Sequence, residues 1–434
     1  MTRDLLHDFY DMLMESQYWS HEQMQAYQHE QLEQLLRHAR QNVPFYETRL
    51  DAVFQPDGSI NWDRWGEIPI LKRQDLAVHR EAMLARVVPP GHGEARDYTT
   101  SGSSGVPITV RANSIAALAN RAAELRAFNW HGIDYANNLC SFTSDKGEAM
   151  WPEGRRLGPW GPSWASGASA GRHSQINAYE TSAHQLDFLR QSETEYLVAV
   201  PMAAYALALE AERLGHEIAL DTILYYGSEE LPAASEVRAR VFGATALSRY
   251  ASKESNGIGH TCPTGGHYHV HAENILVEVL DESDRPCGPG QTGRIVVTPF
   301  LSTHQPIIRY ELGDLVRLGG MCSCGRTLPV LESVSGRVNH IFRFPDGSSS
   351  YRRLPQSMRH QLKCGMWQIA QVEPLEMELR YEPLDWGEIG DEAGVAEFIR
   401  SIYHPDLRVS VKRMRTIPLT AAGKLIEYSY EVDA

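Results

Sequence analysis

Between residues 136 and 300, short apolar runs alternate with stretches of helical pattern, and this alternation constrains the fold more than any other feature. The run YLVAV precedes MAAYALALEAERLG, TILYYG precedes ASEVRARVF, and TALSRYA and ILVEVLD follow. Strands separated by helices are typical of βαβ units, in which parallel strands form a sheet covered by helices. The segment therefore predicts an α/β fold with a largely parallel sheet.

The length of 434 residues exceeds what one ordinary core supports, so we expect more than one domain. An amphipathic helix is expected over 21–41, ending at Asn42 and Pro44. Beyond about Arg337, LEMELRYEP, VAEFIRSIY and LRVSVKRMRTIP indicate a small α+β unit. We predict a large N-terminal domain of several subdomains with helix-covered β-sheets, residues 1–336, and a small α+β C-terminal domain, residues 337–434.

Charge and hydropathy exclude several classes of protein. A formal net charge of -14 argues against nucleic acid as a partner, because phosphate binding needs a basic face. The longest apolar run, YLVAVPMAAYALAL, is too short for a bilayer and contains Pro201, and the N-terminus lacks the apolar centre of a signal peptide. Six cysteines in so long a chain predict no disulfide framework. We expect a cytoplasmic protein without a membrane partner, and the N-terminal helix could support a homodimer.

The stretch YTTSGSSGVPITV, residues 98–110, places glycines and hydroxyl side chains between two strand-like runs. Glycines let backbone N–H groups turn toward an anion, and the hydroxyls add donors, so the loop suits the phosphates of a nucleotide. A Walker P-loop is excluded, because that motif ends in Gly-Lys-Ser/Thr and opens directly into a helix. A plain hairpin connection is the alternative. A helix with Asn113 or Ser114 as its N-cap is expected next.

Six segments in order resemble the motifs of adenylate-forming enzymes, the acyl-CoA synthetase superfamily. They are TSGSSGVP (100–107), YYGSEELP (225–232), RYASKE (249–254), RYELGDLVRL (309–318), VSGRVNHIF (334–342) and LTAAGKL (419–425). Within the superfamily, LLRHARQNVPFYETRL, IPILKRQDL and CSCGRTLPVLESVSGR are similar to the phenylacetate–coenzyme A ligase branch. The resemblance implies the two-domain fold of that superfamily, with a mobile C-terminal domain.

The resemblance also implies roles for residues at matching positions. Lys424 would be the catalytic cation between the acid's carboxylate and the α-phosphate of ATP, and Glu254 would coordinate Mg²⁺. Asp314 would accept hydrogen bonds from the ribose hydroxyls, and Arg337 would approach the ribose or the phosphates. The phosphate loop would comprise Thr100, Ser101, Gly102, Ser103, Ser104 and Gly105, and the adenine would be bordered by Gly227, Ser228, Glu229 and Tyr250. The alternative is that these residues have no catalytic or binding role: Lys424 would be a solvated lysine, Glu254 a surface glutamate and Asp314 a turn residue.

The sequence departs from the family pattern at the hinge between the domains. Position 339 is Asn where the motif has Asp. Asparagine keeps the shape and loses the charge, so we expect rotation of the C-terminal domain to be retained. The departure puts the efficiency of the second half-reaction, thioester formation, in doubt.

Cysteine and histidine spacing indicates a metal site. Cys262, His269, Cys322 and Cys324 could form a closed tetrahedral Zn²⁺ site of structural type. His269 is preferred to His267 because it stands directly before the strand-like run VHAENILVEV. Members of the ligase branch carry Cys and His at such places, whereas the alternative is ordinary buried cysteines.

The hypothesis for function is an ATP-dependent acid–coenzyme A ligase for a small carboxylic acid, using ATP/AMP, Mg²⁺, coenzyme A and a structural Zn²⁺. Aromatic residues suggest an aromatic or arylacetic acid, although the tryptophans would equally suit a surface loop. The candidate pocket residues are Phe142, Trp151, Trp160, Trp164 and Tyr225. One alternative passes the activated group to a carrier protein, an amine or another nucleophile. Another is a non-catalytic nucleotide-binding regulator, against which Lys424, Glu254 and Asp314 together argue.

Overall fold

The computed structural model divides into two compact units. It describes residues 4–99, 108–143, 145, 147–165, 170–227, 230, 232–337, 342–346, 349–350, 354, 357–418 and 425–432. Unit 1 comprises Met1–Tyr98, Thr109–Leu312 and Arg317–Val334, and unit 2 comprises Thr99–Ile108, Gly313–Val316 and Ser335–Ala434. Within the described ranges, no helix combines the length and the apolar character needed to cross a membrane.

The large sheet that supports unit 1 has the strand order β11-β12-β13-β14-β10-β9-β8-β7-β6-β3-β5-β4. These strands are β3 (Leu139–Thr143), β4 (Arg155–Pro159), β5 (Arg172–Asn177), β6 (Tyr196–Ala199), β7 (Thr222–Tyr225), β8 (Thr245–Ser252), β9 (Asn256–Thr261), β10 (Tyr268–Val270), β11 (Ile275–Leu280), β12 (Thr292–Pro299), β13 (Tyr310–Leu318) and β14 (Val330–Arg337). A separate pair, β1 (Ala95–Thr99) and β2 (Thr109–Asn113), confirms the strands expected beside the glycine-rich loop.

Only the middle part of the segment that predicts a parallel sheet forms one. Strands β5, β3, β6, β7 and β8 pair in parallel, as the alternation with helices predicts. The pairs β4/β5, β8/β9, β9/β10 and β11/β12 are antiparallel, so the prediction of a largely parallel sheet is wrong for residues 155–159 and 256–299. The reason is the length of the connections: Lys253–Ser255 joins β8 to β9, and so short a link permits only a hairpin.

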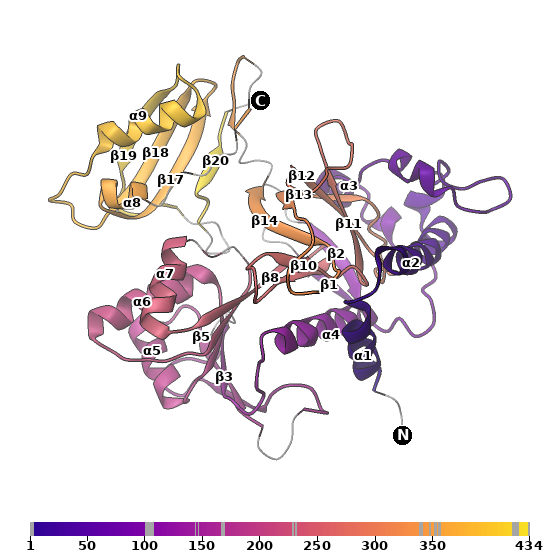
Figure 1. Cartoon of the computed structure of the whole chain (residues 1–434), viewed down its shortest axis with the longest axis horizontal. Helices are drawn as coiled ribbons and strands as arrows, with labels where there is room; N and C mark the ends of the chain where they lie inside the picture. The colour runs from indigo at the N-terminus through magenta and orange to yellow at the C-terminus, as the bar shows by residue number, and fades with distance from the viewer. Residues whose placement is uncertain are drawn as a thin grey trace. The chain divides into compact units, whose positions relative to one another are not determined.

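Helices cover both faces of the parallel strands. Helices α5 (Ser182–Gln191), α6 (Pro201–Leu214) and α7 (Pro232–Phe242) lie together beside β3 and β5 in Figure 1. They bury one face, where Phe142 and Tyr225 lie in the same apolar cluster as Leu186, Leu207 and Phe242. On the other face, Leu139 and Leu224 pack with Leu125 and Phe128 of α4 (Ser114–Trp130). Alternate residues of β3 and β7 thus point to opposite sides.

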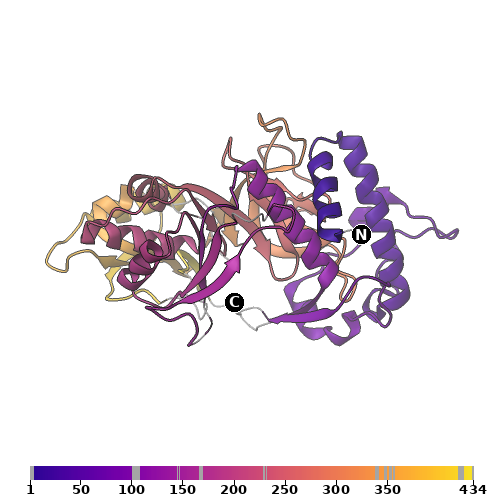
Figure 2. The same ribbon diagram turned by 90° about the horizontal axis from the view of Figure 1, so that it is seen from below.

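The N-terminal helices belong to unit 1. Helix α2 (His21–Asn42) confirms the predicted amphipathic helix; a capping box between Ser20 and Gln23 begins it, and Val43, before Pro44, ends it. Asn113 caps α4, as expected. Figure 2 shows α1 (Leu5–Ser16) and α2 in indigo, near the label that marks the N-terminus. The remaining short elements are α1 (Leu5–Ser16), η1 (Pro44–Tyr46), η2 (Trp62–Glu67), α3 (Arg73–Val78) and η3 (Glu81–Met83).

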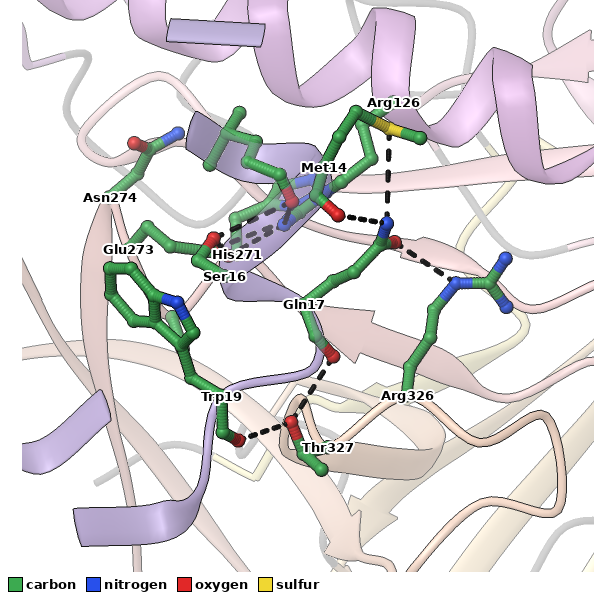
Figure 3. A network of polar contacts seen from close by, with 12 residues as sticks. Met14, Ser16, Gln17, Trp19, Arg126, His271, Glu273, Asn274, Arg326 and Thr327 are labelled. Carbon is green, nitrogen blue, oxygen red and sulfur yellow. Dashed lines mark hydrogen bonds and ion pairs between the residues drawn. The ribbon is translucent and has the colours of Figure 1, made fainter. Parts of the chain in front are cut away.

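A buried polar network joins α1 to α4 and to the segment before β11 (Figure 3). Arg126 of α4 and Glu273 are both fully buried and form an ion pair at 2.6 Å. Arg126 also donates to the carbonyl of Leu13 at 3.1 Å, and Ser16 Oγ donates to Glu273 at 2.5 Å. Because a buried charge is stable only when it is paired and hydrogen-bonded, this network fixes the position of α1 against α4 and the segment before β11.

Unit 2 contains a four-stranded sheet of order β19-β18-β17-β20. Strands β17 and β18 are antiparallel, whereas β18/β19 and β17/β20 are parallel. Trp367, Leu379, Ile399 and Met358 are buried together between the strands and the helices. The elements are β15 (Phe342–Arg343), β16 (Ser349–Ser350), α8 (Ser357–Leu362), β17 (Cys364–Glu373), β18 (Glu376–Pro383), α9 (Glu392–Tyr403), β19 (Arg408–Arg413) and β20 (Tyr428–Tyr430).

Candidate functional site

Glu254 lies in the tight turn between β8 and β9, and its side chain is only 8% exposed. Arg73, the first residue of α3, places its Nη1 3.4 Å from Glu254 Oε1. The hydroxyl of Tyr310, which begins β13, lies 3.5 Å from the same oxygen. A carboxylate buried at a strand end and held by a cation is not a surface glutamate. Its oxygens are the donors that Mg²⁺ prefers.

Tyr250 and Gly227 lie at neighbouring strand ends of the same sheet. Tyr250 is buried in β8, where it pairs with Gly259 and places its ring 6.0 Å from the ring of Tyr268. Gly227 follows β7 with φ of +83°, a conformation that favours glycine. Because β7 and β8 are parallel neighbours, their carboxyl ends lie at one edge, where ligands of α/β sheets usually bind.

Asp314 lies within β13, directly after Gly313, which has φ of +81°. Its side chain is partly exposed, and its role at the ribose stays a prediction. Arg337 is the last residue of β14, and its side chain is outside the described part of the structure. The other predicted residues that lie outside the described residues are Thr100, Ser101, Gly102, Ser103, Ser104, Gly105, Ser228, Glu229, Asn339 and Lys424.

The five aromatic residues predicted to line an acid pocket do not form one wall. Phe142 and Tyr225 lie in the cluster beneath α5, α6 and α7, whereas Trp160 and Trp164 pack on the α4 face of the sheet. Trp160 is buried and donates to the carbonyl of Asn137 at 2.7 Å. Side chains on opposite faces of one sheet cannot line a common pocket, so the prediction is wrong as a set.

The other two tryptophans have local ring partners. Trp151 stacks on His184 with ring centroids 4.1 Å apart and donates to Asp187 at 3.1 Å. Trp164 stacks on His7 of α1 at 4.4 Å. These contacts match the alternative of loop tryptophans that pack against the domain.

Four metal-ligating side chains converge at one end of the β9–β10 hairpin. The ligand atoms of Cys262, His269, Cys322 and Cys324 all lie within 4.8 Å of one another. Cys262 follows β9 and His269 lies in the middle of β10, while Cys322 and Cys324 come from the turn between β13 and β14. His267, the alternative ligand, does not belong to this group.

The distances fit a tetrahedral ion. Two Zn–S bonds of about 2.3 Å at the tetrahedral angle place their sulfurs about 3.8 Å apart. The Sγ atoms of Cys262 and Cys322 are 3.8 Å apart, and Nε2 of His269 is 3.3 Å from Sγ of Cys324. Three thiols and one imidazole leave no open position, so the donor set fits a structural zinc rather than a catalytic one.

Local electrostatics favour the ligating forms of two of these groups. Burial, helped by neighbouring His267, lowers the pKa of His269 to about 4, so its imidazole is neutral at neutral pH. Burial alone would raise the pKa of the Cys324 thiol, but hydrogen bonding by the Arg326 backbone N–H and by Cys322 outweighs it and lowers the pKa. A neutral imidazole and an acidified thiol are the forms that bind zinc.

The turn that carries Cys322 and Cys324 also holds the link between α1 and α2 (Figure 3). Thr327 Oγ1 donates to the carbonyl of Trp19 at 2.6 Å and to that of Gln17 at 3.1 Å. Arg326 donates to Gln17 Oε1 at 3.2 Å. The turn that carries two of the candidate metal ligands is therefore hydrogen-bonded to the link between the N-terminal helices.

Sequence reasoning missed Arg73 as a partner of Glu254. The residue stands in IPILKRQDL, a segment quoted only for its resemblance to the ligase branch. Two adjacent cations at the start of a short helix were an available signal, but the partner of Arg73 lies 181 residues away and only the fold brings the two together.

Comparisons with known proteins agree with this fold. No protein-family profile matches the chain. A solved 2-hydroxyisobutyryl-CoA ligase, in the postadenylation state with 2-HIB-AMP, matches 95% of this chain and 93% of its own with a TM-score of 0.71 at 20% identity. The amide bond synthetase McbA from Marinactinospora thermotolerans matches 76% of this chain and 67% of its own, with a TM-score of 0.55 at 16% identity. The fold is that of the adenylate-forming ligases.

Sequence similarity points to one branch of that class. The phenylacetate–coenzyme A ligase of Thermus thermophilus is 27% identical over 334 residues, which are 74% of this chain and 72% of the relative. The phenylacetate–coenzyme A ligase of Escherichia coli is 25% identical over 333 residues, with the same shares. The chain thus resembles the phenylacetate–coenzyme A ligases, and both the predicted resemblance and the predicted fold class are confirmed.

Proposed function

We propose that this chain is an ATP-dependent acid–coenzyme A ligase that activates an aromatic or arylacetic acid. The acid's carboxylate oxygen attacks the α-phosphorus of ATP, and pyrophosphate leaves. The thiol of coenzyme A then attacks the acyl carbon of the acyl adenylate, and AMP leaves. One observation supports this proposal most strongly. Six motifs that resemble those of the superfamily occur in order on a chain whose fold matches an acyl-CoA ligase over 95% of its length.

The difficulty of the first step is electrostatic, because an anion approaches a polyanion. Lys424 would neutralise the charge that develops between the carboxylate and the α-phosphate. Glu254 would hold Mg²⁺ against the phosphates, with Arg73 holding this carboxylate in place. The loop Thr100–Gly105 would bind the outer phosphates, and Asp314 would orient the ribose.

We propose further that Cys262, His269, Cys322 and Cys324 hold a Zn²⁺ ion of structural type. The ion would join the β9–β10 hairpin to the turn before β14. Its support is the convergence of four donors at distances that suit a tetrahedral site. Zinc would supply stability here and no chemistry.

The test of the activity is product analysis over a panel of acids. Purified protein with ATP, Mg²⁺ and coenzyme A should convert phenylacetate or a related aromatic acid to its thioester, with one AMP and one pyrophosphate for each thioester. Omitting the acid or coenzyme A should abolish steady turnover. Hydrolysis of ATP that does not depend on any acid would contradict the proposal.

One residue favours a second candidate function, in which the acyl group passes to an acceptor other than coenzyme A. Position 339 is Asn where the hinge motif of the superfamily has Asp. If this change impairs thioester formation, the adenylate would pass to another nucleophile, such as an amine. In that case pyrophosphate release would be indifferent to coenzyme A and would increase when an amine is added.

A further inference from the structure

The chain holds one end of its predicted adenine-binding segment with a nearly buried ion pair. Glu230 follows Gly227, Ser228 and Glu229, and its side chain and that of Arg238 are each 11% exposed. Arg238 donates from Nε to Glu230 Oε1 at 2.8 Å and from Nη2 to Glu230 Oε2 at 3.1 Å. This is the planar, two-point geometry in which a guanidinium fixes a carboxylate most firmly.

Other contacts tie the pair to three elements of unit 1. The hydroxyl of Tyr225, the last residue of β7, donates to Glu230 Oε1 at 2.8 Å. Arg238, on α7, also donates from Nη2 to Ser235 Oγ at 2.9 Å and from Nη1 to the carbonyl of Ala244. Arg238 therefore connects the helix, the turn that leads into β8 and the segment after β7.

The arrangement fixes both ends of the segment 226–230 to the sheet. At its beginning, Tyr225 is 3% exposed and packed in the cluster beneath α6 and α7. At its end, Glu230 accepts three hydrogen bonds from Tyr225 and Arg238. With its carboxylate held by these contacts, the side chain of Glu230 has little conformational freedom.

We infer that Arg238, acting through Glu230, is a positioning residue for the nucleotide. It would hold Glu230 in place at one end of the predicted adenine-binding segment, so that less conformational entropy is lost there when ATP binds. The inference rests on the proposed function. Nucleotide affinity should therefore depend on the pair, whereas binding of the acid and the chemical step should depend on it little.

The same helix offers a matched control. Arg240 forms a pair with Glu212 at 2.8 Å, but these side chains are 60% and 41% exposed, and the pair joins α7 to α6 rather than to the nucleotide segment. Both arginines are on α7 and both bind a glutamate with two nitrogens. The two arginines differ in burial and in the element to which their glutamate partner belongs: Glu230 belongs to the nucleotide segment and Glu212 to α6.

The experiment compares Arg238→Met, Arg238→Lys and Arg240→Met with the wild type. Two quantities are measured: the KM values for ATP and for the acid in acid-dependent pyrophosphate release, and the Kd for AMP by calorimetry. Arg238→Met should raise the KM for ATP and the Kd for AMP by about tenfold, the size of a lost charge-assisted contact. The KM for the acid should change by less than about twofold, Arg238→Lys should recover part of the loss, and Arg240→Met should match the wild type.

Each possible result of this experiment either supports or overturns the inference about Arg238. A folded Arg238→Met protein with unchanged AMP affinity, or with equal losses for ATP and acid, overturns the inference and leaves the proposed function standing. If Arg238→Met does not fold, Tyr225→Phe is decisive: it removes one hydrogen bond to Glu230 and should weaken AMP binding about threefold, and an unchanged Kd overturns the inference. A wild type that binds AMP but releases no pyrophosphate with any acid contradicts only the proposed function, and one that binds no AMP overturns both.

Discussion

Replacement of Arg126 by methionine should destabilise unit 1 by about 3–5 kcal/mol, because it leaves the Glu273 carboxylate buried and without its cation. Both side chains are fully buried, and Arg126 reaches the two carboxylate oxygens at 2.6 and 3.2 Å. The substitution also removes the donor to the Leu13 carbonyl, which ties α4 to α1. Ser16 remains as a donor to Glu273, but a hydroxyl does not neutralise the charge.

The magnitude follows from the difference between breaking a buried pair and replacing it. Removing one partner costs about 3–5 kcal/mol, whereas replacing both by apolar residues of similar volume is often neutral. The double variant Arg126→Met/Glu273→Met should therefore recover most of the stability. Arg121→Met is the matched control on α4: its pair with Glu124 is 39% and 26% exposed, and its loss should change stability by less than about 1 kcal/mol.

Urea unfolding measured by tryptophan fluorescence tests this prediction, because the guanidinium of Arg126 lies 5.2 Å from the Trp130 ring. A protein of two units need not unfold in one step, so hydrogen exchange of α1 and α4 should accompany the fluorescence. Both helices should lose protection in Arg126→Met. A single variant as stable as Arg121→Met, or a double variant no better than the single, would refute the reasoning.

Three further predictions concern zinc, catalysis and pH. The purified protein should contain one zinc per chain; Cys322→Ser should lose the metal and increase hydrogen exchange at Gln17–Trp19, whereas Cys287→Ser should keep one zinc. Lys424→Ala should lower acid-dependent pyrophosphate release by at least about a hundredfold while ATP still binds, and an unimpaired variant would remove that role. Arg380 lowers the pKa of Glu431 through a hydrogen bond. A carboxylate whose pKa is lowered by folding stabilises the fold at pH values above its unfolded pKa of about 4.3, and this stabilisation is lost as the pH falls through its folded pKa. Hydrogen exchange at β20 should therefore increase below about pH 4 in the wild type and much less in Glu431→Gln.

The sequence predicted those features of the fold that depend on local pattern. The helix over 21–41, its end before Pro44 and the cap at Asn113 follow from amphipathicity and capping chemistry, which act within a few residues. The antiparallel half of the large sheet was missed. Apolar runs such as ILVEVLD have the same appearance in parallel and antiparallel sheets, and only the length of the connection distinguishes them.

The candidate site was also predictable only in part. The cysteines and His269 were predicted from their residue types and from the resemblance to the ligase branch, and the choice of His269 over His267 agrees with the cluster in the structure. The aromatic pocket failed, because composition does not reveal on which face of a sheet a tryptophan lies. Arg73 with Glu254, and Arg126 with Glu273, are pairs formed across long stretches of chain, which no local pattern predicts.

The central claim is that the chain joins AMP to a carboxylic acid, and isotope exchange between pyrophosphate and ATP tests it most directly. With ATP, Mg²⁺ and labelled pyrophosphate but no coenzyme A, the account predicts label in ATP only when a suitable acid is present. It predicts almost none with Lys424→Ala. Exchange that proceeds equally without acid, or no exchange with any acid from a protein that binds ATP, would contradict the account.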